Sequence, residues 1–251
     1  MLFLRSLVFT SLQIVTTVIF SLLGVLLWPM PFEWRYKIVS KWAHLNLWLL
    51  EKVCGVSYKI EGLENIPDEP CVIMCKHQSA WETLALQIVF PQQVWVLKRE
   101  LLWIPFFGWG LAALNPIAID RSAGRKALSQ VVEQGKKRLL SGVWIVIFPE
   151  GTRIPAGEIG RFGIGGAKLA VESGANVLPV AHDAAKAWPK KGFIKYPSEI
   201  KMVVGKKIEV KGKTAAELNK QVYQWMEGQM TSLEGVPPEI YVKEDKNSGK
   251  K

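Results

Sequence analysis

The sequence predicts an α/β fold in which a largely parallel sheet is covered by helices, preceded by a membrane-embedded pair of N-terminal helices. Beyond Gly55, short apolar runs alternate with helix-like stretches, an order typical of parallel sheets. The runs are continuously apolar, as expected of strands buried on both faces. A long uncharged segment precedes them. These observations predict an anchor at 1–55, a folded domain at 56–242 and a disordered basic tail at 243–251.

The uncharged segment, residues 6–32, is long enough to cross a hydrocarbon core at about 1.5 Å per helical residue. A single preceding arginine and the lack of a small-residue cleavage site argue against a signal peptide. Residues 34–52 predict a second, amphipathic helix at the membrane interface, after a turn at Pro29 and Pro31. The alternative is one spanning anchor followed by a linker. Polar residues recur at helical spacing in the first helix, as on a face turned toward another helix: Thr10, Gln13, Thr17 and Ser21.

In the folded domain, functional residues are expected just beyond the carboxyl ends of the strands, as in other open α/β sheets. The segments that follow each apolar run are therefore the candidates for a site. The predicted strands are 71–75, 94–97, 116–119, 143–148, 177–181 and 201–205. The predicted helices are 79–90, 123–141, 164–173 and 214–231.

The net charge of +10 suits an anionic partner, which leaves a lipid surface, a phosphorylated small molecule, nucleic acid or an acidic protein. Eleven tryptophans favour the lipid surface, and no RNA-binding or helix-turn-helix motif supports nucleic acid. Because Arg35, Lys37 and Lys41 follow the uncharged segment, residues 33–251 are expected in the cytoplasm. Three cysteines without repeated spacing predict neither a disulfide framework nor a metal site.

The first strand-end block is CKHQSAWE. His77 falls just past the run that ends at Cys75, and Ser79 suits the start of a helix. A turn after His77 would bring Glu82 back onto the imidazole. A carboxylate on one ring nitrogen would fix the tautomer and leave the other nitrogen as a general base near neutral pH.

Two alternatives remain for this block. Ser79 and Glu82 have the spacing of a capping box, in which Glu82 would only satisfy the backbone N–H of Ser79. Cys75 and His77 share one face of a strand, so a Cys75 thiolate is an alternative nucleophile. A cysteine inside an apolar run is more often simply packed.

Two further strand ends carry cationic residues. In VWIVIFPEGTR, a glycine that lets the backbone turn stands beside Arg153, whose guanidinium suits a phosphate. In PIAIDRS, Asp120 and Arg121 follow a strand. Between the blocks, KRELLWIPFFGWG adds Lys98, Arg99 and an aromatic stretch, which is either a core loop or a site for an apolar chain. The alternative for the Arg153 block is an ordinary turn with a surface arginine. The alternative for Asp120 and Arg121 is a solvated charge pair.

Together these blocks resemble the 1-acylglycerol-3-phosphate acyltransferase family, the bacterial PlsC-like enzymes, over roughly residues 60–210. HQSAWE matches the family's His-x4-Asp block. KRELLWIPFFGWG and NPIAIDR match the second block, FPEGTR the third and VLPVA the fourth. Glu82 stands where the family usually has Asp, and RFGIGGA, residues 161–167, lacks the basic residue expected near Gly163 or Ile164. The resemblance implies a glycerol-3-phosphate acyltransferase-like fold.

The resemblance also implies a reaction. His77 would take the proton of the free 2-hydroxyl of 1-acyl-glycerol-3-phosphate, with Glu82 orienting His77. The alkoxide would attack the thioester of acyl-CoA or acyl carrier protein and yield phosphatidic acid. The remaining implied site residues are Arg121, Arg153, Gly151 and Thr152 for the substrate phosphate, and Glu150 and Lys98 for positioning.

No cofactor and no metal is implied, since acyl-CoA or acyl carrier protein serves as co-substrate. The implied partners are lysophosphatidic acid and membrane lipid, at the inner (cytoplasmic) membrane with the catalytic domain on the cytoplasmic side. One alternative is another lysophospholipid or glycerol-phosphate acyltransferase. The other is a non-catalytic, membrane-anchored binder of anionic lipid. His182, after the fourth block, would line the site or make a structural hydrogen bond.

Overall fold

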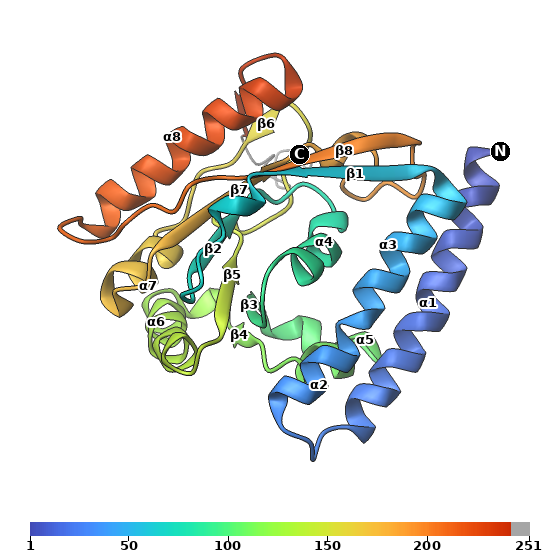
Figure 1. Ribbon diagram of the computed structural model, residues 1–251, viewed down its shortest axis with the longest axis horizontal. Helices are drawn as coiled ribbons and strands as arrows, with labels where there is room; N and C mark the ends of the chain where they lie inside the picture. Colours follow the sequence, from blue (N-terminus) through green and yellow to red (C-terminus); the bar gives the residue numbers. More distant parts are fainter. Residues whose placement is uncertain (242–251) are drawn as a thin grey trace, which may run out of the picture.

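The computed structural model describes residues 1–241 and, of Arg121, the backbone alone. The tail predicted at 243–251 lies outside the described residues. Seven strands form one sheet in the order β1-β8-β7-β2-β5-β3-β4 (Figure 1). Their bounds are β1 Val56–Glu61, β2 Val72–Cys75, β3 Gln93–Lys98, β4 Ile117–Ile119, β5 Trp144–Ile147, β7 Val177–His182 and β8 Ser198–Val204.

The strands from β7 to β4 all run parallel, which confirms the predicted largely parallel sheet. At the other edge, β8 is antiparallel to β7 and parallel to β1. The reversal arises because no crossover helix joins β7 to β8, and parallel neighbours need such a crossover. All six predicted strands are present. β1 was not predicted, because VSYKIE alternates between half-buried and exposed residues at the sheet edge.

Helices cover both faces of the sheet (Figure 1). One face packs Ile73, Cys75 and Val146 against α4 Trp81–Val89 and the N-terminal helices. The other packs Val72, Met74 and Ile145 against α6 Arg125–Leu140, α7 Gly165–Ser173 and α8 Ala215–Glu234. Neighbouring residues of β2 therefore point to opposite cores, which explains why its sequence is continuously apolar. The helices predicted at 79–90, 123–141, 164–173 and 214–231 are confirmed.

The N-terminal helices are α1 Leu2–Leu26, α2 Phe32–Val39 and α3 Lys41–Cys54. The prediction of one helix at 34–52 was wrong in one respect, because the helix is broken at Ser40. The polar face of α1 does meet other helices. Of the four predicted residues, Ser21 lies against Gly110 of α5, and Gln13 and Thr17 line a cavity between helices. The hydrogen bond from α1 to Asn46 of α3 comes from Thr16, which was not among the four. Among the described residues, α1 is the one helix long and apolar enough to cross a membrane.

The remaining elements are short and lie mainly around the strand ends. α5 Phe107–Ala113 was not predicted, and it packs on α1. β6 Glu158–Ile159 pairs with β9 Glu239–Ile240 in a separate small sheet. The 3-10 segments are η1 Leu63–Asn65, η2 Arg99–Trp103, η3 Arg121–Ala123 and η4 Ala184–Lys186.

Candidate active site

The carboxyl ends of β2, β5, β3 and β4 meet at one edge of the sheet, because these strands are parallel neighbours. His77 follows β2, Lys98 ends β3, Arg121 follows β4 and Glu150 follows β5. The fold thus gathers at one edge four residues that lie far apart in the sequence. This is where open α/β sheets place their ligands.

His77 and Glu82 form a pair. The distance from His77 Nδ1 to Glu82 Oε1 is 2.7 Å. Glu82 lies in the first turn of α4, and the intervening residues turn the chain back so that the two side chains meet despite their i, i+5 spacing. With Nδ1–H donating to the carboxylate, His77 Nε2 has a lone pair to accept a proton. His77 also stacks on Phe148, with ring centroids 4.0 Å apart and planes 15° apart.

The capping function proposed for Glu82 is also present in part. Its carboxylate accepts the backbone N–H groups of Gln78 and Ser79 as well as the His77 ring. The Ser79 hydroxyl oxygen accepts the Trp81 N–H at 3.2 Å, where a complete capping box would have the Glu82 N–H, and the hydroxyl donates to the Trp188 carbonyl. One carboxylate therefore holds both the turn and the imidazole.

Glu82 is fully buried, so its charge needs compensation. Burial opposes the charged form. Nearby His182, the hydrogen bond and charge of His77 and the Ser79 N–H outweigh it, so that the pKa of Glu82 lies below its usual value. Glu82 is therefore a carboxylate at neutral pH. The charged carboxylate accepts the Nδ1–H of His77 and so orients the imidazole ring.

His182 lies beneath this pair, with Nε2 at 3.8 Å from Glu82 Oε2. It is held by structural hydrogen bonds: Nε2 donates to the Lys76 carbonyl, and Nδ1 accepts the Ala184 N–H. Burial lowers the pKa of His182, which keeps the ring neutral. His182 was expected either to line the site or to make a structural hydrogen bond, and the geometry matches the structural hydrogen bond.

Glu150 is also buried, and it joins two of the sequence blocks. Its carboxylate accepts Lys76 Nζ at 2.7 Å, the His77 N–H at 2.9 Å and the Gly160 N–H at 2.9 Å. Both side chains of the Lys76–Glu150 pair are fully buried. Glu150 therefore positions the loop and the backbone of His77. Lys76 was not predicted from the sequence, although a lysine at the end of an apolar strand signals a buried carboxylate partner.

The loop after β5 brings Arg153 close to the histidine. Gly151 has a φ of +67°, a conformation that favours glycine in this turn, and Thr152 is exposed. Ile154 N–H donates to the His77 carbonyl at 2.7 Å, which fixes the loop beside the pair. Among the described residues, no carboxylate forms an ion pair with the half-buried Arg153.

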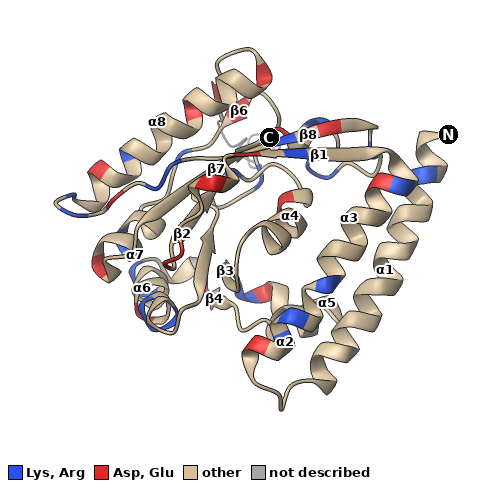
Figure 2. Ribbon diagram, in the orientation of Figure 1, with Lys and Arg blue, Asp and Glu red and all other residues tan. Residues whose placement is uncertain are grey.

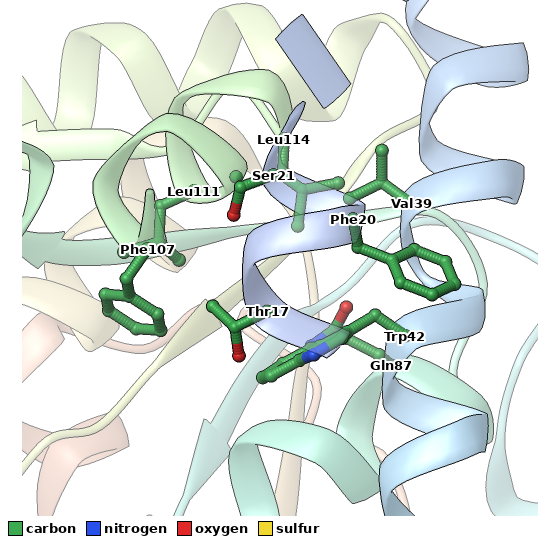
Figure 3. A pocket seen from close by; sticks show the side chains of 10 residues that line it. Thr17, Phe20, Ser21, Val39, Trp42, Gln87, Phe107, Leu111 and Leu114 are labelled. Atoms are coloured by element: carbon green, nitrogen blue, oxygen red, sulfur yellow. The ribbon is translucent and has the colours of Figure 1, made fainter. Parts of the chain in front are cut away.

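Arg153 lines a cavity of about 390 Å³ between α1, α3, α4 and the start of α5. It is the one charged residue among the described residues that line this cavity; the others include Ala80, Thr83, Trp42 and Phe106. An adjoining apolar chamber lies between α1, α5 and the α2–α3 segment (Figure 3). Thr17, Trp42 and Phe107 line both spaces. Arg153 lines only the first cavity, and most of the side chains that line the second are apolar.

Lys98 and Arg99 lie at the rim of the strand ends. Lys98 is half-exposed and pairs with Glu100 at 3.1 Å, and Arg99 pairs with Asp120 at 3.1 Å. Asp120 also accepts the Ser122 N–H at 2.9 Å. Asp120 thus caps the turn that carries the backbone of Arg121.

The alternative nucleophile, Cys75, does not fit the geometry. Its side chain is fully buried in the core of the sheet. Burial, with Glu82 and Glu150 nearby, raises the pKa of its thiol well above the usual value. The thiol therefore stays protonated at neutral pH, and a thiolate nucleophile is disfavoured.

A histidine oriented by a buried carboxylate, open on its second nitrogen and placed beside a cationic cavity, suits an enzyme that activates a hydroxyl group for attack. The family model described as Acyltransferase matches residues 57–183. The chain is 44% identical over 242 residues to a 1-acyl-sn-glycerol-3-phosphate acyltransferase of Pseudomonas aeruginosa, covering 94% of each sequence. It is 31% identical to the human 1-acyl-sn-glycerol-3-phosphate acyltransferase alpha, covering 58% of this chain and 53% of the human protein.

A solved structure agrees with these matches. The crystal structure of the 1-acyl-sn-glycerophosphate acyltransferase PlsC from Thermotoga maritima has a TM-score of 0.78 and 25% identity, covering 96% of this chain and 97% of that one. The class of protein is thus an acyltransferase. The chain belongs to the 1-acylglycerol-3-phosphate acyltransferase family.

Proposed function

We propose that this protein transfers a fatty acyl group from an acyl thioester to the 2-hydroxyl of 1-acyl-glycerol-3-phosphate, making phosphatidic acid. The observation that carries the proposal is the joining of His77 and Arg153 through one loop, with the cavity of Arg153 reaching α1. His77 as a base would act on a hydroxyl group of the substrate. Arg153, which has no carboxylate partner among the described residues, would bind an anionic group. An apolar chamber lined by a membrane-type helix suits a lipid chain.

In the proposed reaction, His77 Nε2 takes the proton of the 2-hydroxyl as the oxygen attacks the thioester carbonyl carbon. A new carbon–oxygen bond forms, and the tetrahedral intermediate then expels the thiolate. The imidazolium returns the proton to the leaving sulfur, so that His77 is restored. Glu82 keeps His77 in the required tautomer and stabilises the imidazolium between these steps.

We propose that Arg153 and Arg121 bind the substrate phosphate, with Gly151 and Thr152 shaping the loop that carries Arg153. An arginine fork matches phosphate geometry and remains charged at all relevant pH values. Lys98, half-exposed at the end of β3, would add positive charge at the rim. Glu150 would act through the loop and the His77 backbone, since its carboxylate is fully buried.

The donor is an acyl thioester of coenzyme A or of acyl carrier protein, and the net charge of +10 suits either acidic donor. No metal or other cofactor enters the proposed steps. Residues 1–55 would serve as the membrane anchor and 56–242 as the catalytic domain. The proposed location is the inner (cytoplasmic) membrane, with the catalytic domain on the cytoplasmic side, because basic residues follow α1.

The test measures thiol release from each thioester in detergent micelles, with and without lysophosphatidic acid. We expect release that requires the lipid acceptor and disappears in His77→Ala. Release with a lysophospholipid that bears another headgroup, and not with lysophosphatidic acid, would favour the alternative acyltransferase. No release from folded protein with either donor, together with tight binding of the acceptor, would favour the non-catalytic lipid binder.

A further inference from the structure

The exposed tryptophans are confined to two stretches of the chain. Trp28, Trp34 and Trp48 lie on or between the N-terminal helices. Trp103 and Trp109 lie far along the sequence, within η2 and α5. Tryptophan is enriched where a protein meets the headgroup region of a bilayer. Its distribution here indicates that two separate parts of the chain share one environment.

We call Leu101–Trp109 the aromatic segment. Its exposed apolar side chains are Leu101 (36%), Trp103 (67%), Ile104 (44%), Phe106 (37%) and Trp109 (43%). Phe106 has a φ of 60°, and its ring lies 4.9 Å from that of Trp109. Half-exposed Lys98 and Arg99 lie three and two residues before the segment, separated from it by Glu100, and they pair with Glu100 and Asp120, respectively. Basic residues beside exposed aromatic ones are typical of segments that contact anionic lipid.

The aromatic segment is held against α1. Gly110 and Ser21 are so close that a Cβ added to Gly110 would lie 2.8 Å from the Ser21 hydroxyl. Ile14 of α1, which is 59% exposed, lines the same cavity as Phe106. The apolar surface therefore continues from α1 onto the segment. In Figure 2, α1 carries charge only near its N-terminal end, and this charge is Arg5.

We propose that the aromatic segment is a second membrane contact, which inserts Trp103 and its apolar neighbours into the phospholipid leaflet that α1 occupies. Continuity with α1 selects a bilayer as the partner, because a surface that adjoins a membrane helix would otherwise expose its aromatic side chains to water. Lys98 and Arg99 would lie at the depth of the anionic headgroups. The inference rests on the proposed membrane location and not on the acyl-transfer reaction.

The experiment places an environment-sensitive fluorophore on Trp103→Cys in the full-length protein, bound to vesicles of phosphatidylethanolamine and phosphatidylglycerol. Leu140→Cys is the control, because Leu140 is 88% exposed on α6, which covers the opposite face of the sheet. The three native cysteines are buried and leave the new thiol as the accessible one. We expect the label at 103 to shift to shorter wavelength with vesicles and to be quenched by nitroxide lipids, while the label at 140 remains unchanged.

Equal emission and equal quenching at both positions, with the protein bound to vesicles, would overturn the proposal. So would a blue shift at 103 that grows with protein concentration and needs no vesicles, because a second copy of the chain would then cover the segment. Neither readout depends on catalysis, so an inactive protein would contradict the proposed reaction and leave this result standing.

A kinetic measurement adds a second check. Trp103→Ser should raise the KM for a long-chain acceptor in vesicles severalfold, and leave the KM for a short-chain, dissolved acceptor unchanged. Trp103 does not line the Arg153 cavity, so its loss has no direct route to the bound substrate. An equal rise for both acceptors would contradict a membrane contact.

Discussion

The two halves of the site differ in how their charges are satisfied. Around His77, the carboxylates of Glu82 and Glu150 are fully buried and accept several hydrogen bonds each. Around Arg153, the guanidinium faces a cavity and lacks a carboxylate partner among the described residues. In the proposed mechanism, the base is therefore held in place before substrate arrives, while the cation is left for the substrate to pair. Four predictions follow from this difference.

The largest effect is expected from the base itself. His77→Ala should lower kcat by about 10²–10⁴-fold, the usual contribution of general acid–base catalysis, with little change in thermal stability. The measurement is steady-state thiol release in detergent micelles. His44→Ala is the matched control, because His44 lies exposed on α3 and should be neutral. A kcat within twofold of wild type would remove His77 from the reaction.

The buried ion pair should matter for stability. Lys76→Met leaves the Glu150 charge buried without its cation, which costs about 3–5 kcal/mol of unfolding free energy. The double variant Lys76→Met with Glu150→Gln should regain much of this loss. Chemical denaturation followed by fluorescence gives both values. Lys136→Met, which breaks the exposed pair with Glu172, should cost less than about 1 kcal/mol. Equal losses for the two lysine variants would show that burial is irrelevant here.

Substitution of Arg153 should weaken binding of the phosphorylated acceptor. Arg153→Ala should raise the KM for the phosphorylated acceptor by roughly 10–100-fold, as expected for a charged hydrogen bond of about 1.5–3 kcal/mol, and leave the KM for the thioester unchanged. Arg161→Ala, at an exposed position, is the control. If the thioester KM rises instead, Arg153 binds the donor, and the two halves of the site need new assignments.

The smallest effect is a pH dependence of stability from His182. Its pKa in the folded protein lies below the ordinary value of 6.5, so the unfolded chain takes up the proton first as the pH falls. The stability contributed by neutral His182 is present above pH 6.5 and declines below it, by up to about 1.4 kcal/mol per pH unit. Denaturation curves of wild type and His182→Gln between pH 5 and about 7 measure this slope. An identical slope in both would exclude His182 as its source.

The fold was largely predictable because each strand of the parallel region is continuously apolar and is followed by a helix. β1 escaped prediction because an edge strand with one exposed face lacks that pattern. α5 also escaped, since its glycine-rich sequence has low helix propensity and its packing on α1 is a tertiary effect.

The contacts of the candidate site were predictable where they join residues close together in the sequence, and were not predictable where they join distant residues. The pairing of His77 and Glu82 needs only a turn of four residues, and the sequence blocks indicated it. Lys76 could not be placed in this way, because its partner Glu150 lies 74 residues away in the sequence. Phe148 could not be placed either, because its partner His77 follows a different strand of the sheet. Glu150 was expected to position the substrate, which it could do by contact with the glycerol or through the loop. Only the three hydrogen bonds of its buried carboxylate separate these two roles.

The docking of α1 has a consequence for synthesis. The Ser6 hydroxyl accepts the N–H of Lys195, 189 residues further along the chain. At about 5–20 residues per second, that partner leaves the ribosome on the order of 10–40 s after α1 does. During this interval α3, whose Asn46 is hydrogen-bonded to Thr16, is the early partner of α1. Ribosome-bound chains long enough to expose α3 should therefore already protect Leu47→Cys, in a Cys54→Ser background, from thiol reagents, because Leu47 shares a buried cluster with Phe9 of α1. Full reactivity there would mean that α1 waits for the whole domain.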